Sequence, residues 1–415
     1  MTGCDDCCGR LIYTEPSLNF NSLATICGED TVKGISRRSF LRSALGTAAA
    51  APFFLRGRYR VFAASATEYP ERVVRLMRES IVIDMLNQFL YRTDQQELKE
   101  RWLTQPGAFT EADYQRFRST GVHAINFGEG ADSAADAQTL FAKWNNFMAQ
   151  YPQWLMRIDC AADFARARES GRLGILYGLQ SSAQFEKLDD VNRCFGFGQR
   201  VSQLSYNFRS LVADGAFEPY DAGVSEYGAK VIGRMNQVRM AVDLGHASDK
   251  TKLDALEISK APLILSHGNC RALNPKSRRA STDDAIRKLA AKGGVMGITD
   301  IAFMVKGTDP VTIDDVIDHY DHVRDLVGIE HVGVGSDAGI ESNDLGSPQV
   351  LNEMLTRADP RYNVHGGHEV VVGLQGPTRM WELCAALVRR GYTDEQITLV
   401  LGGNWARVLR EIWGS

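Results

Sequence analysis

Residues 240–269 read MAVDLGHASDKTKLDALEISKAPLILSHGN, and this stretch decides the fold. It contains two apolar runs of strand length, which lead into His246 and His267, with a helix-like segment between them. A buried strand and the helix after it occupy about this many residues, so consecutive parallel strands would carry both imidazoles to one edge of a sheet. Either histidine alone is more often an ordinary side chain that follows a strand. The pair at one strand–helix period predicts a parallel sheet with a metal site.

The same pattern of strand and helix recurs along the chain. Near-continuous apolar runs are typical of parallel strands that helices cover on both faces. Eight such runs predict an α/β fold, a closed (β/α)8 barrel of the TIM type, as a single domain with a C-terminal helical extension. The runs are residues 81–86, 121–127, 174–180, 200–206, 240–246, 262–267, 293–298 and 331–337.

The candidate active site follows from this fold, because chemistry in TIM barrels sits at the carboxyl ends of the strands. The side chains that end or directly follow the eight runs are therefore the ones expected to face a substrate. They are Leu86, Asn126, Gln180, Tyr206, His246, His267, Thr299, Asp300 and Asp337.

The composition agrees with one large domain and excludes some classes of partner. The chain has 415 residues, of which 44% are hydrophobic, and this is ample for one large core. Its net charge is −4 and its Lys and Arg residues are dispersed, so we expect no binding to nucleic acid. Outside the first 66 residues, no stretch approaches the roughly 20 apolar residues that a membrane-spanning helix needs.

The first 66 residues are a different kind of sequence. SRRSFLRS at residues 36–43 contains the pair Arg37 and Arg38, and an apolar stretch and a small-residue site that ends at Ala66 follow in that order. This order predicts a twin-arginine signal peptide and a periplasmic domain over residues 67–415, with the twin-arginine translocation machinery as a partner. The long segment before the arginines leaves a mis-assigned start open. A surface arginine pair before an amphipathic helix is the other interpretation.

Longer motifs surround the strand ends. They are RVSQLSYNFRSLVADG (200–215), APLILSHGNCRAL (261–273), KSRRASTDD (276–284), HVGVGSDAG (331–339) and GGNWARVL (402–409). In order and spacing they resemble the motifs of the renal-type membrane dipeptidases, and the resemblance covers residues 72–412. It implies a (β/α)8 metallopeptidase that hydrolyses dipeptides, and in some members β-lactam amides. It also implies two zinc ions bridged by a glutamate and a water or hydroxide.

Some residues match functional positions of that family, and their roles are what the resemblance implies. His246 and His267 match the two histidines that bind the second zinc ion, and Asp337 matches an aspartate near the substrate amino group. The arginine that pairs with the substrate carboxylate corresponds to Arg279, or to Arg278 when the spacing is counted from His267. A planar guanidinium suits a carboxylate because it offers two parallel donors.

Four positions depart from the family pattern. Leu86 and Gln88 stand where the family has a histidine and an aspartate of the first zinc site. Gln180 replaces the bridging glutamate, and Tyr206 replaces a histidine. Two adjacent divalent ions need anionic ligands to offset their repulsion, so we expect no binuclear centre.

A single zinc ion is compatible with the residues that remain. We assign His246, His267 and Gln180 as its ligands, with Asp337 and Asp300 as alternative oxygen donors. Three protein ligands and an open position for water are the arrangement of catalytic zinc. A chain without metal is the alternative.

We therefore predict an exported, metal-dependent, dipeptidase-like hydrolase that acts on an amide bond of a dipeptide or a small peptide-like molecule. Asp337 and Tyr206 are the catalytic candidates, and both bind substrate together with Arg279. Tyr206 suits an oxyanion donor better than a base, because its reference pKa is about 10. The alternative is a family member that has lost peptidase chemistry and binds or tailors a peptide-like metabolite, for instance in siderophore maturation. A monomer and a homodimer are both left open.

Other polar residues have a structural and a functional interpretation. His319 and His322 lie on an outer helix, where packing is favoured over metal binding. His365 and His368 lie in the loop after the last strand, as part of a solvated loop or of a lid over the site. Asp84 either supports its strand or orients His267 from behind.

Overall fold

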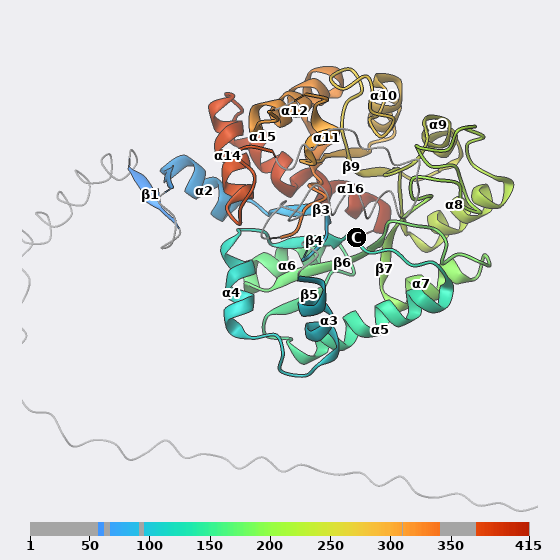
Figure 1. The fold of residues 1–415 in the computed structure, drawn as a ribbon, viewed down its shortest axis with the longest axis horizontal. Coiled ribbons are helices and arrows are strands. Elements are labelled where there is room, and N and C mark those ends of the chain that lie inside the picture. The colour runs from blue at the N-terminus through green and yellow to red at the C-terminus, as the bar shows by residue number, and fades with distance from the viewer. Residues whose placement is uncertain (1–56, 62–66, 91–94, 309, 341–370, 415) are drawn as a thin grey trace, which may run out of the picture. The chain divides into compact units, whose positions relative to one another are not determined.

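The computed structural model describes residues 57–61, 67–90, 95–308, 310–340 and 371–414, all within the unit that begins at Leu55. Parallel strands form a barrel in the order β3, β4, β6, β7, β8, β9, β10 and β11, and helices surround it (Figure 1). The predicted (β/α)8 barrel is thereby confirmed. The strands are Ile83–Asn87 (β3), Ala124–Phe127 (β4), Leu173–Leu179 (β6), Gln199–Gln203 (β7), Ala241–Asp243 (β8), Ile264–Gly268 (β9), Val295–Ile298 (β10) and Val332–Val334 (β11).

One further strand lies beside the barrel. β5 (Leu155–Arg157) pairs in parallel with β6, and no apolar run in the sequence predicted it. The eight barrel strands are neighbours in chain order, with β5 left out between β4 and β6. Each strand–helix unit therefore places its strand beside the preceding barrel strand. This order brings the carboxyl ends of all eight strands to one end of the barrel.

The barrel closes where β3 meets β11. The backbone N–H of Asp337 donates to the carbonyl of Leu86 at 2.9 Å, and the N–H of Gln88 donates to the carbonyl of Ala338 at 2.9 Å. These bonds come just beyond the ends of the two strands. They bring Gln88 and Asp337 side by side at the carboxyl end.

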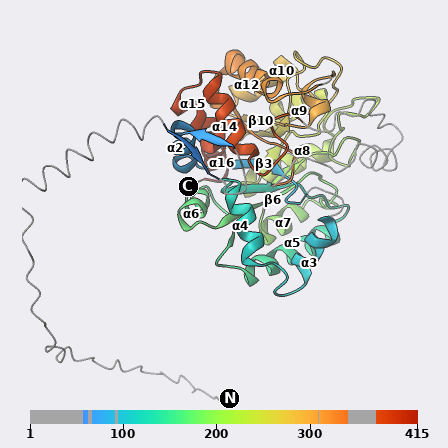
Figure 2. The same ribbon diagram turned by 60° about the vertical axis from the view of Figure 1, so that its left-hand side comes forward.

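Helices cover the outside of the barrel (Figure 2). Several begin at a serine or threonine whose side chain accepts a backbone N–H three residues later, as Ser225, Ser248 and Thr282 do, which satisfies a donor left free in the first turn. The helices are Glu71–Glu79 (α2), Gln96–Thr104 (α3), Glu111–Ser119 (α4), Ala134–Gln150 (α5), Ala162–Ser170 (α6), Asp190–Phe197 (α7), Glu226–Val238 (α8), Asp249–Ile258 (α9), Asp283–Ala291 (α10), Ala302–Val305 (α11), Ile313–Val327 (α12), Ile329–His331 (η2), Arg379–Arg389 (α14), Asp394–Thr398 (α15), Leu399–Gly403 (η3) and Asn404–Trp413 (α16).

Helix α16 closes the amino-terminal end of the barrel. Trp405, Leu409 and Ile412 of this helix belong to one apolar cluster with residues at the starts of the strands, such as Ala241 and Val295. The indole N–H of Trp405 also donates to the carbonyl of Val334 at 3.0 Å. Because this end is filled by a packed helix, the opposite, carboxyl end is left for the site.

A short antiparallel hairpin precedes the barrel. β1 (Arg58–Arg60) pairs with β2 (Glu68–Pro70), so residues expected to belong to a signal peptide fold beside the start of the barrel domain. The paired arginines of that expected signal lie outside the described residues. Within the part of the chain that the structure describes, no helix is both long and apolar enough to cross a membrane.

Candidate active site

His246 and His267 come together as their spacing predicted. His246 lies in the turn after β8, and His267 lies near the carboxyl end of β9. The centroids of the two imidazole rings are 4.9 Å apart, and both side chains are buried. Burial lowers the pKa of each histidine well below its usual value, and the charge of Arg279 lowers it further. Both rings are therefore neutral at physiological pH.

Three neighbours surround the ring of His246. Its Nδ1 lies 2.7 Å from Oδ1 of Asn207, and its Nε2 lies 3.1 Å from Oε1 of Gln180. The phenol ring of Tyr206 stacks on the imidazole, with 4.2 Å between the centroids. Tyr206 is 47% exposed, and its ring covers one face of the histidine.

His267 is engaged on both nitrogens. Nη2 of Arg279 lies 3.0 Å from Nε2 of His267, and because a guanidinium only donates, this nitrogen is the acceptor. The proton of the neutral ring is then on Nδ1, which donates to Oγ of Ser266 at 2.9 Å. The structure also separates the two candidate arginines. Arg279 is buried beside the histidines, whereas Arg278 donates to the backbone carbonyls of Phe217 and Glu218.

Asp337 is joined to Gln88 across the closure of the barrel. Nε2 of Gln88 donates to Oδ1 of Asp337 at 2.7 Å. Burial raises the pKa of Asp337 to about 6, although the hydrogen bond from Gln88 and the charge of Arg279 oppose this shift. The carboxylate is therefore ionised near neutral pH but titrates close to it, as suits a general base.

Three site residues have strained backbone. Asn207, His246 and Asp337 have φ values of 60°, 60° and 58°, in the left-handed region that non-glycine residues rarely adopt. Such a conformation is unfavourable by roughly 1–3 kcal/mol per residue and persists only where the surroundings impose it. Of the five described non-glycine residues with positive φ, these three carry side chains in the site. Three of the strained residues are therefore gathered at the carboxyl ends of the strands.

A buried charged network supports the strand ends beside the site. Oδ1 and Oδ2 of Asp84 accept from the backbone N–H and the hydroxyl of Ser336 at 2.8 and 2.6 Å. Arg379, the first residue of α14, donates to Asp84 at 3.1 Å and to Asp300 at 3.4 Å. Burial raises the pKa of Asp300 to about 7, although Arg379 opposes this shift. Asp84 thus holds the segment that leads into Asp337, and it does not orient His267.

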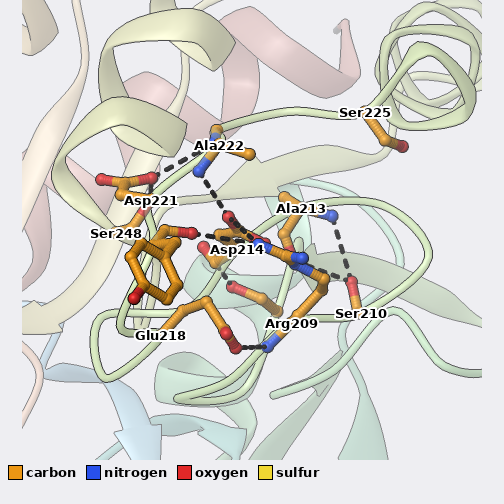
Figure 3. Close-up of polar contacts among 12 residues, drawn as sticks. Arg209, Ser210, Ala213, Asp214, Glu218, Asp221, Ala222, Ser225 and Ser248 are labelled. Atoms are coloured by element: carbon orange, nitrogen blue, oxygen red, sulfur yellow. Dashed lines mark hydrogen bonds and ion pairs between the residues drawn. The ribbon is translucent and has the colours of Figure 1, made fainter.

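The loop between β7 and α8 forms a wall of the site and is tied together by polar contacts (Figure 3). Arg209 makes a two-pronged ion pair with Asp214, at 2.6 and 3.1 Å. Oγ of Ser248, two residues after His246, donates to Asp221 of this loop at 2.6 Å. The backbone carbonyl of His246 accepts from Ala216 of the same loop at 2.8 Å. The loop that carries Tyr206 and Asn207 is therefore fastened to the turn that carries His246.

A buried lysine lies close behind this region. Lys252 of α9 is 1% exposed, and its ammonium has no hydrogen-bond partner among the described residues. Burial lowers the pKa of Lys252 to about 7, although Asp249 opposes this shift. Its charge acts on His246 and lowers the pKa of that ring as well. The cationic character of this side of the site comes from Lys252 together with Arg279.

The other residues expected at the strand ends bond to neighbouring strands of the barrel. Leu86 is buried and gives its carbonyl to Asp337. Asn126 donates to the carbonyl of Met85 at 2.9 Å, and the hydroxyl of Thr299 donates to the carbonyl of Ser336 at 2.8 Å. Among the described residues, none of these three side chains makes a hydrogen bond to either histidine.

The outer histidines pack as expected. His319 accepts from the backbone N–H of Cys270 and lies 2.9 Å from the carbonyl of Val305. His322 lies 2.9 Å from Asp283 of the neighbouring helix. His365 and His368 lie outside the described residues.

The donors in this cluster do not suit a pair of metal ions. Throughout the described ranges, no three His, Cys, Asp or Glu side chains converge as a metal site. A pair of divalent ions therefore does not fit, because Gln88 and Gln180 are amides and Leu86 has no donor. The two imidazoles and the amide oxygen of Gln180 remain as neutral donors near one another. Any ligand of Nε2 of His267 must, however, displace Arg279 from that nitrogen.

Sequence reasoning missed several residues that shape the site. Asn207, Ser336 and Arg379 were not among the candidates, yet they contact His246, Asp84 and Asp300. Asn207 follows Tyr206 directly, and asparagine is one of the few residue types that tolerate a left-handed conformation, so a turn at this point was a usable signal. Arg379 had no local signal, because it comes from a helix far along the chain.

Comparison with known proteins gives one family. A family model described as membrane dipeptidase (peptidase family M19) matches residues 70–359. The chain is 33% identical over 246 residues to the dipeptidase verJ of Clonostachys rogersoniana, and 30% identical over 257 residues to the dipeptidase tcpJ of Claviceps purpurea. These alignments cover 59% and 61% of this chain, and 56% and 54% of the relatives. The chain thus spans little more than half the length of these curated relatives.

Solved structures with the same fold include members of this family. An amidohydrolase from Pseudomonas aeruginosa is 26% identical, with a TM-score of 0.70 over 83% of this chain and 99% of that chain. The dipeptidase AC, a metallopeptidase of family M19, is 19% identical, with a TM-score of 0.66 over 80% of this chain and 99% of that chain. At the latter identity the likeness concerns the fold alone.

Proposed function

Because the chain belongs to the membrane dipeptidase family, we propose that it is a metal-dependent hydrolase of an amide bond in a dipeptide or a small peptide-like molecule. The observation that supports this proposal is the set of charges at the carboxyl ends of the strands. One guanidinium, Arg279, and one carboxylate, Asp337, lie with two neutral imidazoles, His246 and His267. A dipeptide carries one carboxylate and one ammonium, so its two ends complement these two charges.

Arg279 would bind the substrate carboxylate. Arg279 is buried, and from the loop after β9 its guanidinium reaches Nε2 of His267. A guanidinium in such a place forms two parallel hydrogen bonds to a carboxylate. Asp337 uses Oδ1 to accept from Gln88, which leaves Oδ2 for the substrate ammonium or for a proton.

His246, His267 and Gln180 would hold one divalent ion, which we propose to be zinc. When bound, such an ion supplies Lewis-acid polarisation of the amide carbonyl. With its pKa at about 6, Asp337 is ionised near pH 7 and accepts a proton from the attacking water. The hydroxyl of Tyr206 donates a hydrogen bond to the amide oxygen as negative charge develops on it.

A second function is favoured by one specific observation. Arg279 donates into the nitrogen of His267 that an ion would use, and Lys252 adds a further buried cation nearby. These charges oppose a divalent cation and favour an anionic ligand. The alternative is therefore a family member that binds or tailors a peptide-like metabolite, as in maturation of a siderophore, without hydrolysing it.

A single set of assays separates these functions. Wild type is tested against a panel of L,L- and L,D-dipeptides, with and without a chelator, beside the triple variant Leu86→His, Gln88→Asp, Gln180→Glu. Activity in wild type that disappears with chelator supports the one-ion hydrolase. Silence in wild type with activity in the variant supports the repurposed pocket. Silence in both proteins, each correctly folded and unable to bind dipeptides, overturns the dipeptide assignment.

We also propose that the protein is exported by the twin-arginine route to the periplasm. The support is the order of Arg37, Arg38, an apolar stretch and a small-residue site that ends at Ala66. The variant Arg37→Lys, Arg38→Lys is expected to remain in the cytoplasm, as measured by cell fractionation. Export of this variant at the wild-type rate would contradict the proposal.

A further inference from the structure

A hollow lies beside the C-terminal ends of α2, α4 and α6, outside the candidate active site. Its volume is about 720 Å³. Its polar lining consists of three arginines, one histidine, one serine and one glutamate, and its apolar wall includes Met77 and Trp381. We call this hollow the arginine groove, defined by Arg78, Arg118, His123, Arg168 and Glu169.

The fold brings these arginines together from three helices. Arg78 lies in the last turn of α2, Arg118 in the last turn of α4, and Arg168 in the last turn of α6. The strands that follow these helices are β3, β4 and β6, which are neighbours in the barrel. The guanidinium of Arg168 also donates to the backbone carbonyl of Arg78, at 3.3 and 3.1 Å, which ties α6 to α2. The three helices lie along one side of the barrel in Figure 2.

The groove has more donors than acceptors. Within the described residues, the side chains of Arg78 and Arg118 make no hydrogen bond or ion pair, and Glu169 is the one acidic side chain of the lining. Arginines elsewhere on the same helices behave differently, because Arg116 pairs with Asp113 at 3.3 Å and Arg166 pairs with Asp163 at 3.1 Å.

His123 adds one more donor. Its Nδ1 accepts the backbone N–H of Val82 at 3.0 Å. Burial lowers the pKa of His123 to about 3, and the charges of Arg118 and Arg168 lower it further, so the ring is neutral. A neutral ring whose Nδ1 accepts carries its proton on Nε2.

A position at a helix C-terminus explains part of this arrangement. A cation there is favourable because the helix end carries a partial negative charge. This effect accounts for one arginine in each last turn. It does not require the three arginines to line a common hollow of a size that small-molecule sites typically have.

We propose that the arginine groove binds a small organic anion with two or more phosphate or carboxylate groups. Arg78 and Arg118 supply the paired donors that such groups accept, and Arg168 and His123 add further N–H groups. Met77 and Trp381 give an apolar part of the ligand a surface to lie on. Val61 also lines the groove and precedes residue 67, so removal of the expected signal peptide would take away Val61 and leave the arginines, His123, Met77 and Trp381 in place. The groove is a site separate from the proposed hydrolase site.

Isothermal titration of the full chain with pyrophosphate, citrate, inorganic phosphate and vesicles of phosphatidylglycerol tests this proposal. We expect binding of pyrophosphate or citrate with one site per chain, weaker at higher salt and accompanied by a rise in Tm. The variant Arg118→Gln, Arg168→Gln is expected to lose roughly tenfold or more in affinity. Its matched control, Arg116→Gln, Arg166→Gln, removes the same charge from the same two helices outside the groove and keeps the affinity.

The outcomes distinguish a ligand-binding site from arginines that only stabilise the C-termini of their helices. Equal losses in the two double variants would mean that only net charge matters, and would overturn the proposal. The proposal would also be overturned if the wild type bound none of these anions and the groove variant had a lower Tm, because the arginines would then act only on stability. Binding of vesicles alone, with no binding of pyrophosphate or citrate, would also overturn the proposal, because each phosphatidylglycerol headgroup carries a single phosphate. If the groove variant fails to fold, the single variant Arg78→Gln, whose exposed side chain makes no bond in the described structure, gives the same test.

Discussion

The two halves of the strand-end cluster bury polar groups in different ways. Around β3, β10 and β11, a charged half joins Asp84 and Asp300 to Arg379, so that opposite charges are in contact. Around β6 to β9, an imidazole half joins His246 and His267 to Gln180, Asn207 and Arg279. Its contacts are between neutral groups or between a cation and a neutral ring.

This difference separates a support from a site. A buried ion pair is difficult to rearrange, because moving one partner leaves the other uncompensated. Hydrogen bonds between amides and imidazoles exchange for those of a ligand at a smaller penalty. The charged half therefore fixes the closure of the barrel. The imidazole half, which also contains two strained residues, His246 and Asn207, is the half that a ligand can reorganise.

The largest expected effect breaks the charged half. Asp84→Ala removes the buried acceptor that Arg379 and Ser336 share, and although Arg379 keeps its contact with Asp300, we expect a loss of about 3–5 kcal/mol in the free energy of unfolding. The control is Asp394→Ala, which removes partly exposed pairs with Arg72 and Arg75 and should lose no more than about 1 kcal/mol. Urea unfolding measures both. Similar losses in the two variants would show that the network is not a support.

The sequence could predict the imidazole half better than the charged half. Spacing alone placed His246 and His267 at adjacent strand ends, because a strand–helix unit has a nearly constant length. It could not place Arg379, which lies almost 300 residues from Asp84 in the chain and reaches it only through the fold. Nor could it predict the burial of Lys252, because a lysine in an amphipathic helix is usually on the solvent face.

The second effect tests which arginine belongs to the imidazole half. If the proposed function is correct, Arg279→Ala weakens binding of a non-hydrolysable dipeptide analogue by about 2–5 kcal/mol, a factor of tens to thousands. Arg278→Ala is the matched control at the adjacent position, because within the described residues its side chain donates to the carbonyls of Phe217 and Glu218 and not to a histidine. Isothermal titration calorimetry of both variants with the analogue measures the two losses in affinity. An equal loss for Arg278→Ala would reverse the assignment.

The third effect concerns the buried cation behind the imidazole half. Lys252→Met removes an ammonium without a hydrogen-bond partner in the described structure, and should raise the free energy of unfolding by about 1–4 kcal/mol. The pKa of Lys252 is lowered from 10.5 to about 7, so between these values the unfolded chain binds more protons than the folded chain. Wild type is therefore stabilised as pH rises through this window. The advantage of the variant should be largest below pH 7 and should shrink toward pH 10; a difference that does not depend on pH would contradict the shift.

The smallest effect concerns the hydrogen bond across the closure of the barrel, on the side of the charged half. Gln88→Leu removes the hydrogen bond to Asp337, which at present lowers the pKa of that carboxyl group. A hydrogen bond to a charged group contributes about 1.5–3 kcal/mol, so the pKa should rise from about 6 by roughly one to two units. The folded pKa already exceeds the ordinary value of 3.8, so Asp337 reduces stability as pH rises from about 4 to about 6, and in the variant this loss should continue to higher pH. NMR titration of the Asp337 carboxyl carbon measures the shift directly. An unchanged or lowered pKa would mean that Asp337 takes its environment from the imidazole half and not from the closure of the barrel.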